Sequence, residues 1–348
     1  MHQTPRADID TKDHAPLFSV VIVAYRNAAT LAECLDSLAA QTERDFETIL
    51  LDNACPDHSA AAARTYPAAR VIVSNVNLGF AAGNNFAARV ARGQWLVLLN
   101  PDAFPAPDWL AALRAAMRRY PRVRVLTSVQ LDARHPGLFD GIGDAMTCAG
   151  IPYRGGYRTP CRPVPEGEVF SPCGAAMAID RALFLAMGGF DERYFCYCED
   201  VDLGYRLRLA GEPTILVAQA RVRHWGGASS GERSPFAVFH GTRNRLWTFA
   251  KCTPAPLLWL TAPLHLALTV LLLLRERSPA TRAAAWRGFG AGLAGLPAML
   301  AARRTVQAER RATNWAILRM MTLNPASFWG RRGKIVPIAT CDGDAAPS

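Results

Sequence analysis

The stretch "QWLVLLNPDAF", residues 94–104, indicates how this chain folds. Residues 95–99 are five apolar residues in a row, which is typical of a strand buried on both faces of a parallel sheet. The run stops at Asn100-Pro101-Asp102, so the strand ends on an amide, a rigid residue and a carboxylate. Parallel sheets bind ligands beyond the carboxyl ends of their strands, and this makes Asp102 a candidate site residue.

Short apolar runs alternate with segments of helical periodicity on both sides of this strand. The expected strands are 18–25, 46–52, 69–75, 95–99 and 122–130, and the expected helices are 29–41, 83–93 and 107–120. The alternation predicts an α/β fold with a mostly parallel sheet covered by helices on both faces. Asp52 and Asp102 would then lie at the same edge of the sheet, because each comes at the end of a strand.

Composition restricts the class of protein. The chain has 348 residues, of which 50% are hydrophobic and 20% charged, as expected of a globular protein with one large domain or a domain plus an appendage. A net charge of +10 indicates an anionic partner, which can be nucleic acid, a phosphorylated small molecule or lipid headgroups. The nine cysteines show no CxxC spacing and are interpreted as reduced cytosolic thiols.

Two apolar segments, 257–274 and 283–302, follow the sheet region, and each is long enough for a membrane hairpin. Cationic residues lie at both ends of this pair of segments and in the connection between them, whereas a spanning hairpin should carry fewer cationic residues on its outer side. These cations are Lys251, Arg275, Arg277, Arg282, Arg303 and Arg304. The pattern favours helices that lie in the cytoplasmic leaflet. A spanning hairpin and ordinary soluble helices are the alternatives.

Asp102 has the surroundings of a metal ligand. Pro101 fixes the backbone and so helps to aim the carboxylate into the ligand crevice. Mg²⁺ and Mn²⁺ are typically held by one or two carboxylates, with substrate phosphates completing the shell. The alternative is a plain turn in which Asp102 accepts hydrogen bonds from nearby amides.

The segment "NVNLGFAAGNN", residues 75–85, lies between the two carboxylate-bearing strand ends. Gly79 and Gly83 permit close approach of the backbone, and Asn77 and Asn84 offer amide donors. A Gly-rich turn that enters a helix can bind anionic oxygen. A simple strand-to-helix loop would explain the glycines, but not the polar residues at several strand ends.

A second group of candidates lies in "CYCEDVDLGYRLRLAG", residues 196–211. Glu199, Asp200 and Asp202 open a helix, where acidic residues are favoured by the helix dipole alone. Three carboxylates in four positions also repel one another, which raises the pKa of one of them and suits a general base. His224 ends a later strand in "VRHWGG", either as a metal or phosphate ligand or as a structural histidine.

At these motifs the sequence resembles the inverting nucleotide-sugar glycosyltransferases of family 2, which have the GT-A type fold. The resemblance covers roughly residues 18–231 and includes "LLDNACPD", "NLGFAAGNN", "LLNPDAF", "GGFDE", "EDVDLGYRLRLAG" and "HWGG". It is greatest to the rhamnosyltransferase-like branch, which builds bacterial surface polysaccharides. The family's processive synthases carry a QxxRW motif that "QARVRHW" does not match, so addition of a single sugar, rhamnose in that branch, is expected.

The resemblance implies a role for each candidate residue. Asp102 would hold Mg²⁺ or Mn²⁺ in a DxD-like motif whose first aspartate is replaced by Asn100, with His224 beside the diphosphate as a second metal candidate. Asp200 would be the catalytic base, and Glu199 and Asp202 would shape its surroundings. The donor-binding residues would be Tyr25, Asp52, Asn77, Gly79, Phe80, Gly83, Asn84 and Asn100, with Asp52 on the nucleobase.

Composition along the chain, together with the extent of the resemblance, divides the chain. The expected segments are a disordered tail at 1–16, a GT-A domain at 17–232, membrane-associated helices at 233–305 and a partly disordered extension at 306–348. Residues 131–172 form an irregular part of the domain, which is either a substrate-facing insertion or a long surface loop.

The expected partners are a dTDP- or UDP-linked sugar, a lipid-linked saccharide acceptor and an anionic membrane surface. Arg243 and Arg245 would meet the pyrophosphate of the acceptor. Nucleic acid is not expected, because the cations concentrate beside the apolar C-terminal helices, where anionic lipid is the simpler partner. The expected location is the cytoplasmic face of the inner or plasma membrane, in a peripheral or monotopic arrangement. The alternative function is a nucleotide-sugar binding protein without turnover.

Overall fold

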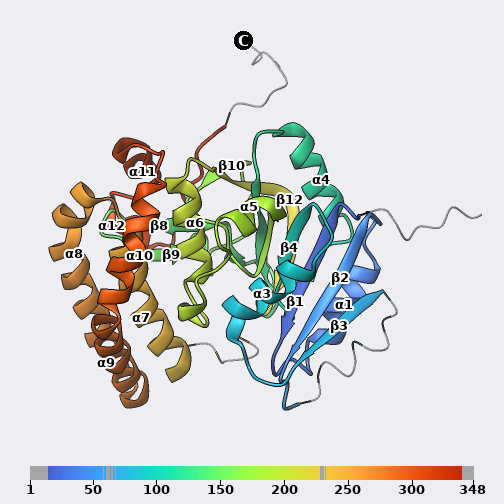
Figure 1. The fold of residues 1–348 in the computed structure, drawn as a ribbon, viewed down its shortest axis with the longest axis horizontal. Coiled ribbons are helices and arrows are strands. Elements are labelled where there is room, and N and C mark those ends of the chain that lie inside the picture. Colours follow the sequence, from blue (N-terminus) through green and yellow to red (C-terminus); the bar gives the residue numbers. More distant parts are fainter. Residues whose placement is uncertain are drawn as a thin grey trace, which may run out of the picture.

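A mixed β-sheet occupies one side of the molecule, and a group of helices from the C-terminal third packs beside it (Figure 1). The structure is a computed structural model, and it describes residues 15–57, 59, 63, 66, 68–227, 231 and 233–338. The tail expected at the N-terminus therefore lies almost wholly outside the described residues.

The first half of the sheet is parallel, as the sequence predicts. β1 (Phe18–Ala24) lies between β2 (Phe46–Asn53) and β4 (Trp95–Leu99), and β3 (Ala69–Ser74) forms the edge beyond β2. Alternate residues of β1 enter different cores: Val20 packs with α1 (Leu31–Ala39), whereas Val21 packs with α3 (Gly79–Val90). Helices thus cover both faces. α3 begins four residues before the predicted helix, at Gly79.

The second half of the sheet is mixed. β11 (Ala176–Asp180) runs antiparallel between β4 and β6 (Val125–Asp132), β12 (Thr214–His224) is parallel to β6, and β10 (Gly167–Val169) is antiparallel to β12. The full order is β10-β12-β6-β11-β4-β1-β2-β3. The pattern of apolar runs did not reveal β11, a short strand that continues directly into α5 (Arg181–Ala186).

The Asn-Pro-Asp turn has a structural reason. Just after it, β5 (Ala103–Pro105) pairs antiparallel with the end of β12, and Ala103 is the register partner of His224. The turn therefore brings Asp102 next to a histidine more than a hundred residues later in the chain. α4 (Trp109–Arg119) follows β5 and packs against β12.

Residues 131–172 are not a surface loop. β7 (Phe139–Gly141) pairs with β6, and β8 (Asp144–Met146) pairs with β9 (Pro152–Arg154). All the residues of β7 and β8 are buried, including two aspartates. Of the two alternatives, the structure supports an insertion that faces the site.

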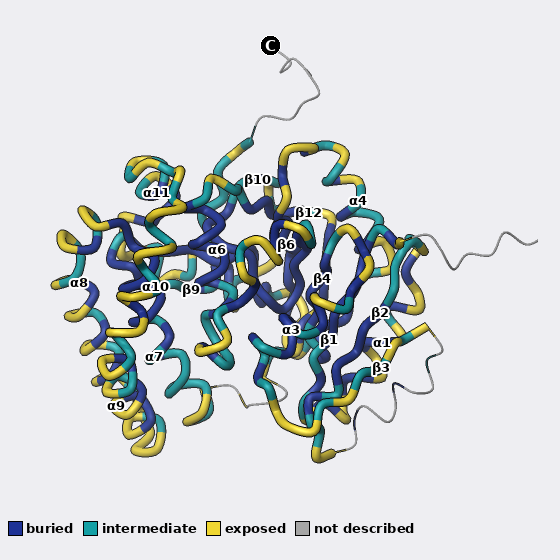
Figure 2. The backbone as a smooth tube through the Cα atoms, in the orientation of Figure 1, coloured by how far each residue is buried: buried dark blue, intermediate teal, exposed yellow. Residues whose placement is uncertain are grey.

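The C-terminal helices begin with α7 (Pro235–Cys252), which lies against α6 (Glu199–Leu209) and α9 (Pro279–Ala294). α8 (Ala255–Leu274), α10 (Leu296–Ala308), α11 (Asn314–Met320) and α12 (Pro325–Trp329) complete the group. Figure 2 shows the central strands buried along their length and much of α8 and α9 exposed. Among the described residues, α8 alone is long and apolar enough to cross a membrane, judged by length and composition.

The apolar segment at 283–302 forms two helices, α9 and α10. α9 ends at Ala294 and α10 begins at Leu296, and Pro297 in the first turn of α10 has no backbone N–H to donate to a carbonyl of α9. Gly295, between the two helices, packs against the ring of Trp247. A Cβ atom on Gly295 would lie 2.5 Å from this ring. The indole nitrogen of Trp247 donates a hydrogen bond to the Gly292 carbonyl at 3.0 Å, which fixes the ring at the break.

Candidate active site

Two adjoining cavities lie at the carboxyl edge of the sheet. The large cavity, about 920 Å³, is lined by Asp102 and His224 among others. The small cavity, about 490 Å³, is lined by Glu199 and Asp200. Both cavities share a wall made of Phe80, Asn100, Arg154, Cys196, Tyr197, Arg233 and Ala237. The candidate metal ligand and the candidate base therefore face connected spaces.

A line of hydrogen bonds and ion pairs starts at Asp102. Its Oδ1 lies 3.3 Å from His224 Nε2, and His224 Nδ1 lies 2.7 Å from Asp140 Oδ2. Burial alone would lower the pKa of His224, but the two carboxylates raise it to about 9. With Nδ1 held by Asp140 and Nε2 within ion-pair distance of Asp102, the His224 ring is placed to support the Asp102 carboxylate. Asn100 Nδ2 approaches the same Nε2 atom at 3.3 Å.

Arg154 continues this line toward the candidate base. Its Nη1 donates to Asp140 Oδ2 at 2.7 Å, and it lines both cavities. Burial would raise the pKa of Asp140, but Arg154 and His224 hold it well below its usual range. The Arg154 charge also acts on Asp144 and Asp200. Charges of alternating sign thus connect the large cavity with the small one.

Asp200 lies in the first turn of α6 and borders the small cavity. Its Oδ2 accepts a hydrogen bond from the Gly174 backbone N–H at 2.8 Å, and its Oδ1 accepts one from Val201 at 2.8 Å. Burial raises its pKa, although these amides and Arg154 partly oppose the shift. A carboxylate that is oriented by two amides and holds protons more readily than usual suits a general base.

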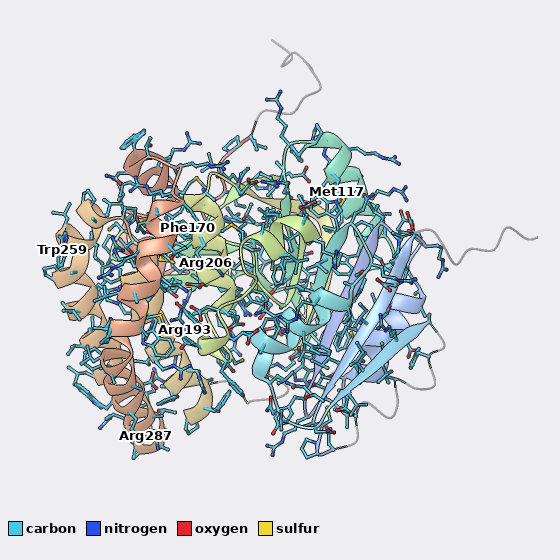
Figure 3. The ribbon with its side chains drawn as sticks, viewed as in Figure 1. Met117, Phe170, Arg193, Arg206, Trp259 and Arg287 are labelled. Atoms are coloured by element: carbon cyan, nitrogen blue, oxygen red, sulfur yellow. The ribbon has the colours of Figure 1, made fainter. Side chains whose placement is uncertain are left out.

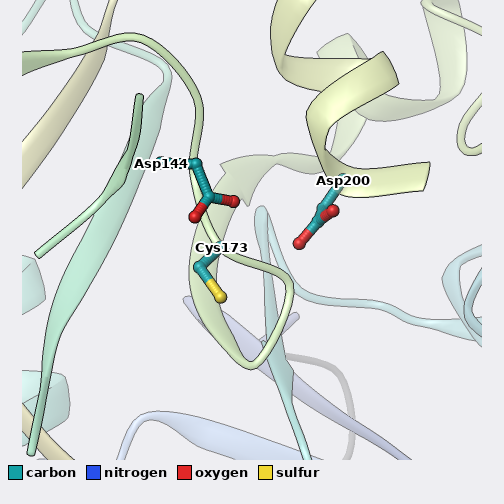
Figure 4. A group of neighbouring side chains, drawn as sticks. All are labelled: Asp144, Cys173 and Asp200. Atoms are coloured by element: carbon teal, nitrogen blue, oxygen red, sulfur yellow. The ribbon is translucent and has the colours of Figure 1, made fainter. Parts of the chain in front are cut away.

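Asp144 and Cys173 share the space in front of Asp200 (Figure 4). One potential ligand atom from each of the three residues lies within 4.8 Å of the other two. Among the described residues, this is the one cluster of three or more His, Cys, Asp or Glu side chains close enough to hold a metal ion. Burial raises the pKa of Cys173 to about 12, and burial together with Asp200 raises that of Asp144. The Cys173 thiol is a soft ligand, which does not match the hard oxygen shell of Mg²⁺ or Mn²⁺.

Asp102 fits such an ion better. It presents a carboxylate to a cavity large enough for a nucleotide, and an ion there would take its other ligands from phosphate and water. The ion would supply positive charge against a departing diphosphate.

The three acidic residues at the start of α6 do not act as one cluster. The Glu199 side chain is buried beside the small cavity, and within the described chain its Oε2 has no hydrogen-bond partner. Asp202 faces α7, where its carboxylate lies 2.7 Å from Lys251 Nζ and 2.9 Å from Arg206 Nε. Burial would raise the pKa of Asp202, but these cations lower it. Asp202 is therefore held in a buried ion pair directed away from Asp200.

The residues predicted to bind the donor divide into two groups. Those that line the large cavity are Tyr25, Asn77, Gly79, Phe80 and Asn100. Gly83 and Asn84 lie deeper: Gly83 packs on Val23 and Leu51, and the Asn84 amide donates to a carbonyl of its own helix. Asp52 ends β2 beside Ala24, and its carboxylate accepts from the Cys55 N–H at 2.9 Å. None of these three is part of the cavity wall.

The two arginines predicted to meet the acceptor differ in the same way. Arg245 lines the small cavity, and its buried Nε has no hydrogen-bond partner among the described residues. Arg243 instead donates to the Tyr194 carbonyl at 2.8 Å and stacks on Trp247, with 4.4 Å from its guanidinium carbon to the ring centre. Arg243 thus anchors α7 and does not reach either cavity wall.

The sequence did not single out Asp140, Asp144 or Arg154. Each is an isolated charged residue in a Gly-rich segment without regular periodicity. Two aspartates four positions apart in "DGIGDAM", inside an otherwise apolar stretch, were the available signal, because buried carboxylates need partners.

Comparison with known proteins agrees with this geometry. A family model described as "Glycosyl transferase family 2" matches residues 19–184. The N-acetylglucosaminyl-diphospho-decaprenol L-rhamnosyltransferase of Mycobacterium tuberculosis (strain ATCC 25618 / H37Rv) is 32% identical over 281 residues, 74% of this chain and 91% of the relative. The chain belongs to glycosyl transferase family 2. It is a glycosyltransferase that takes its sugar from a nucleotide-sugar, as its motifs predict.

Solved structures support the GT-A type fold of this glycosyltransferase. The mannosyltransferase PcManGT from Pyrobaculum calidifontis, in complex with GDP-Man and Mn²⁺, is 19% identical with a TM-score of 0.52, over 88% of this chain and 91% of that one. A fragment of S. aureus TarS in complex with UDP is 16% identical with a TM-score of 0.55, over 94% and 98%. The predicted fold class is confirmed by these two matches, apart from any association with a membrane.

Proposed function

We propose that this glycosyltransferase moves one L-rhamnose residue from a dTDP- or UDP-linked donor to a hydroxyl group of a lipid-linked saccharide, with inversion at the anomeric carbon. The name of the mycobacterial relative, which covers most of both chains, supports the sugar and the class of acceptor. The absence of a QxxRW motif from "QARVRHW" supports a single addition.

The observation that carries the proposal is the position of Asp200. It borders the small cavity, which shares a wall with the large cavity that Asp102 lines. An acceptor hydroxyl in the small cavity would give its proton to Asp200 as its oxygen bonds to the anomeric carbon. The bond between that carbon and the phosphate oxygen breaks on the opposite face, and its electron pair leaves with the nucleoside diphosphate. No covalent intermediate is needed.

Other side chains assist this displacement. His224 and Asp140 hold Asp102 in place, and Arg154 places a positive charge between leaving group and base. Mg²⁺ or Mn²⁺ bound at Asp102 would neutralise charge on the diphosphate, a contribution of several kcal/mol. Arg245 faces the small cavity and would meet an anionic group of the acceptor, such as its pyrophosphate.

The test compares wild type with Asp200→Asn. Both are supplied with UDP-, dTDP- and GDP-linked sugars and a polyprenyl-diphosphate N-acetylglucosamine acceptor, and product is measured by mass spectrometry. We expect the variant to lose about 10²- to 10⁴-fold in kcat while it still binds donor. Equal turnover by the two proteins would exclude Asp200 as the base. Donor binding by wild type without turnover of any sugar would favour the non-catalytic alternative.

We also propose that the enzyme works at the cytoplasmic face of the membrane in a peripheral or monotopic arrangement. Trp259 lies on the outer side of α8 (Figure 3), and it and Leu260 are 76% and 77% exposed. Exposed arginines follow directly after this helix, at 275 and 277, and in the first turn of α9, at 282. An apolar face bordered by cations matches an anionic lipid surface.

A further inference from the structure

The chain returns to the catalytic half of the molecule after α12. The Gly156 backbone N–H donates to the Arg331 carbonyl at 2.6 Å, and the Tyr153 hydroxyl donates to the carbonyl of residue 332 at 2.9 Å. Val336 and Glu168 exchange two backbone hydrogen bonds, of 2.7 and 2.8 Å. Residues 331–336, named here the C-terminal strap, are therefore fixed at both ends to the sheet and to the β8–β9 hairpin.

Glycines on the body of the enzyme make room for this strap. A Cβ atom on Gly155 would lie 2.8 Å from the Cα of Gly333, and one on Gly167 would lie 2.6 Å from the Val336 carbonyl oxygen. The Gly333 Cα and the Val336 carbonyl oxygen are backbone atoms, which cannot move away by a rotamer change as the end of a flexible side chain can. The strap can lie this close only because neither position carries a side chain.

The strap brings one charged side chain into the large cavity. Arg331 is part of the cavity wall, together with Arg154 and Arg233. Arg154 is paired with Asp140 and Arg233 with Glu276, but the recorded ion pairs of the described residues include none for Arg331. Burial lowers the pKa of Arg331, and the charges of Arg233 and Arg154 lower it further.

These contacts leave Arg331 with an unbalanced positive charge. Its recorded side-chain contact is an aromatic one, 5.4 Å from the guanidinium carbon to the centre of the Phe328 ring. The backbone at Arg331 has φ = +52°, a conformation that is uncommon for residues other than glycine and marks a position worth a functional explanation. A guanidinium that is held among other cations and opens on a cavity is an anion site.

We propose that Arg331 binds the diphosphate of the nucleotide-sugar, so that the C-terminal strap completes the donor site. The inference rests on the proposed function. Arg331 lines the large cavity with Asp102 and is absent from the wall of the small one, so the donor and not the acceptor supplies its phosphate. The strap lies far beyond residues 19–184, the part matched by the family. This chain thus recruits a donor-binding group from outside that part.

The test uses full-length Arg331→Met, with Arg332→Met as the matched control, because residue 332 belongs to the same strap but is exposed. Dissociation constants are measured by calorimetry for UDP, dTDP, UMP and dTMP in the presence of Mn²⁺. We expect Arg331→Met to bind the preferred diphosphate about 10- to 100-fold more weakly, as loss of a charged hydrogen bond predicts, with little change for the monophosphate. Arg331→Lys should be intermediate, and Arg332→Met should equal wild type.

Two results would overturn the inference. One is unchanged diphosphate binding by Arg331→Met when wild type binds well. The other is an equal loss for mono- and diphosphate, which would mean that Arg331 makes no contact with the β-phosphate. A lowered melting temperature of Arg331→Met would then indicate an effect on the fold. If the Met variant does not fold, the ratio of diphosphate to monophosphate affinity of Arg331→Lys is compared with that of wild type. Wild type that binds no nucleoside diphosphate contradicts the proposed function itself.

Discussion

Asp200 and Asp202 are two positions apart in the sequence, yet their carboxylates have opposite surroundings. Asp200 faces a cavity, where amides and one arginine only partly offset the cost of burial, and its pKa is raised. Asp202 faces two cations at ion-pair distance, and its pKa is lowered. One is suited to accept a proton, and the other is suited to hold α6 against α7.

This contrast predicts different losses for the same substitution. Asp202→Asn should destabilise the protein by about 3–5 kcal/mol, because Lys251 stays buried with fewer partners. Asp200→Asn should leave stability unchanged or raise it, since a carboxylate with a raised pKa opposes folding at neutral pH. Urea unfolding followed by circular dichroism measures both. Equal destabilisation by the two substitutions would contradict these assignments.

The raised pKa of Asp200 also predicts the pH dependence of transfer. The base works only when ionised, so kcat should fall with decreasing pH at a higher pH than an ordinary aspartate would give. Arg154 lowers the pKa of Asp200, so Arg154→Met should move this acid limb to still higher pH, while Arg154→Lys should keep it near that of wild type. Profiles of kcat against pH for wild type and the two Arg154 variants measure this shift. An acid limb that moves to lower pH in Arg154→Met would show that the charge does not act on the base.

Two candidates from the sequence, Asp102 and Asp200, line the two cavities. Sequence pattern pointed to them because one follows an apolar strand and the other opens a helix. The partners that orient them were missed. Asp140 and Arg154 meet only through the packing of β7 on β6 and of β9 on β8, and such long-range pairing leaves no periodic signal in a single sequence.

At the scale of elements, the sequence predicted the helices and strands whose apolar residues follow a single helical or strand pattern. β4 is a continuous apolar run, β1 and β2 each contain a shorter one, and α1 and α4 have apolar faces at helical spacing. The sequence pattern did not reveal β11, a short strand that pairs with β4 and β6, or the division of 283–302 into α9 and α10 beside Pro297. Composition described the apolar stretch correctly but could not find the break.

The exposed face of α8 gives a prediction at this scale. Trp259→Glu combined with Leu260→Glu should abolish flotation of the enzyme with vesicles of phosphatidylglycerol, because two apolar contacts become charges that anionic lipid repels. Val73→Glu, on the exposed edge strand β3, is the control and should float like wild type. Since both residues of α8 are more than three-quarters exposed, the fold should persist, which a melting curve verifies. Undiminished flotation of the double variant would contradict membrane binding through α8.

At the scale of the whole molecule, the catalytic part and the C-terminal helices share a core. Tyr205 and Leu209 of α6 pack with Cys252 of α7 and with Ile317 and Met320 of α11. The Lys251 side chain, 2% exposed, lies 2.7 Å from carboxylates of Asp191 and Asp202. The sequence suggested a boundary near residue 232, because composition changes there, but apolar and ionic contacts cross that position.

These contacts predict the behaviour of a shortened chain. A protein that ends at residue 232 leaves Asp191 and Asp202 without Lys251 and exposes the α6 side of the shared core, so it should lose its cooperative thermal transition and bind a hydrophobic dye. A chain that ends at residue 338 retains every contact described here and serves as the control, with a melting temperature close to that of wild type. A sharp transition and nucleotide binding by the shorter chain would mean that residues 17–232 fold alone. In that event the C-terminal helices and the strap would be additions to a complete enzyme, and Arg331 would be dispensable for binding the donor.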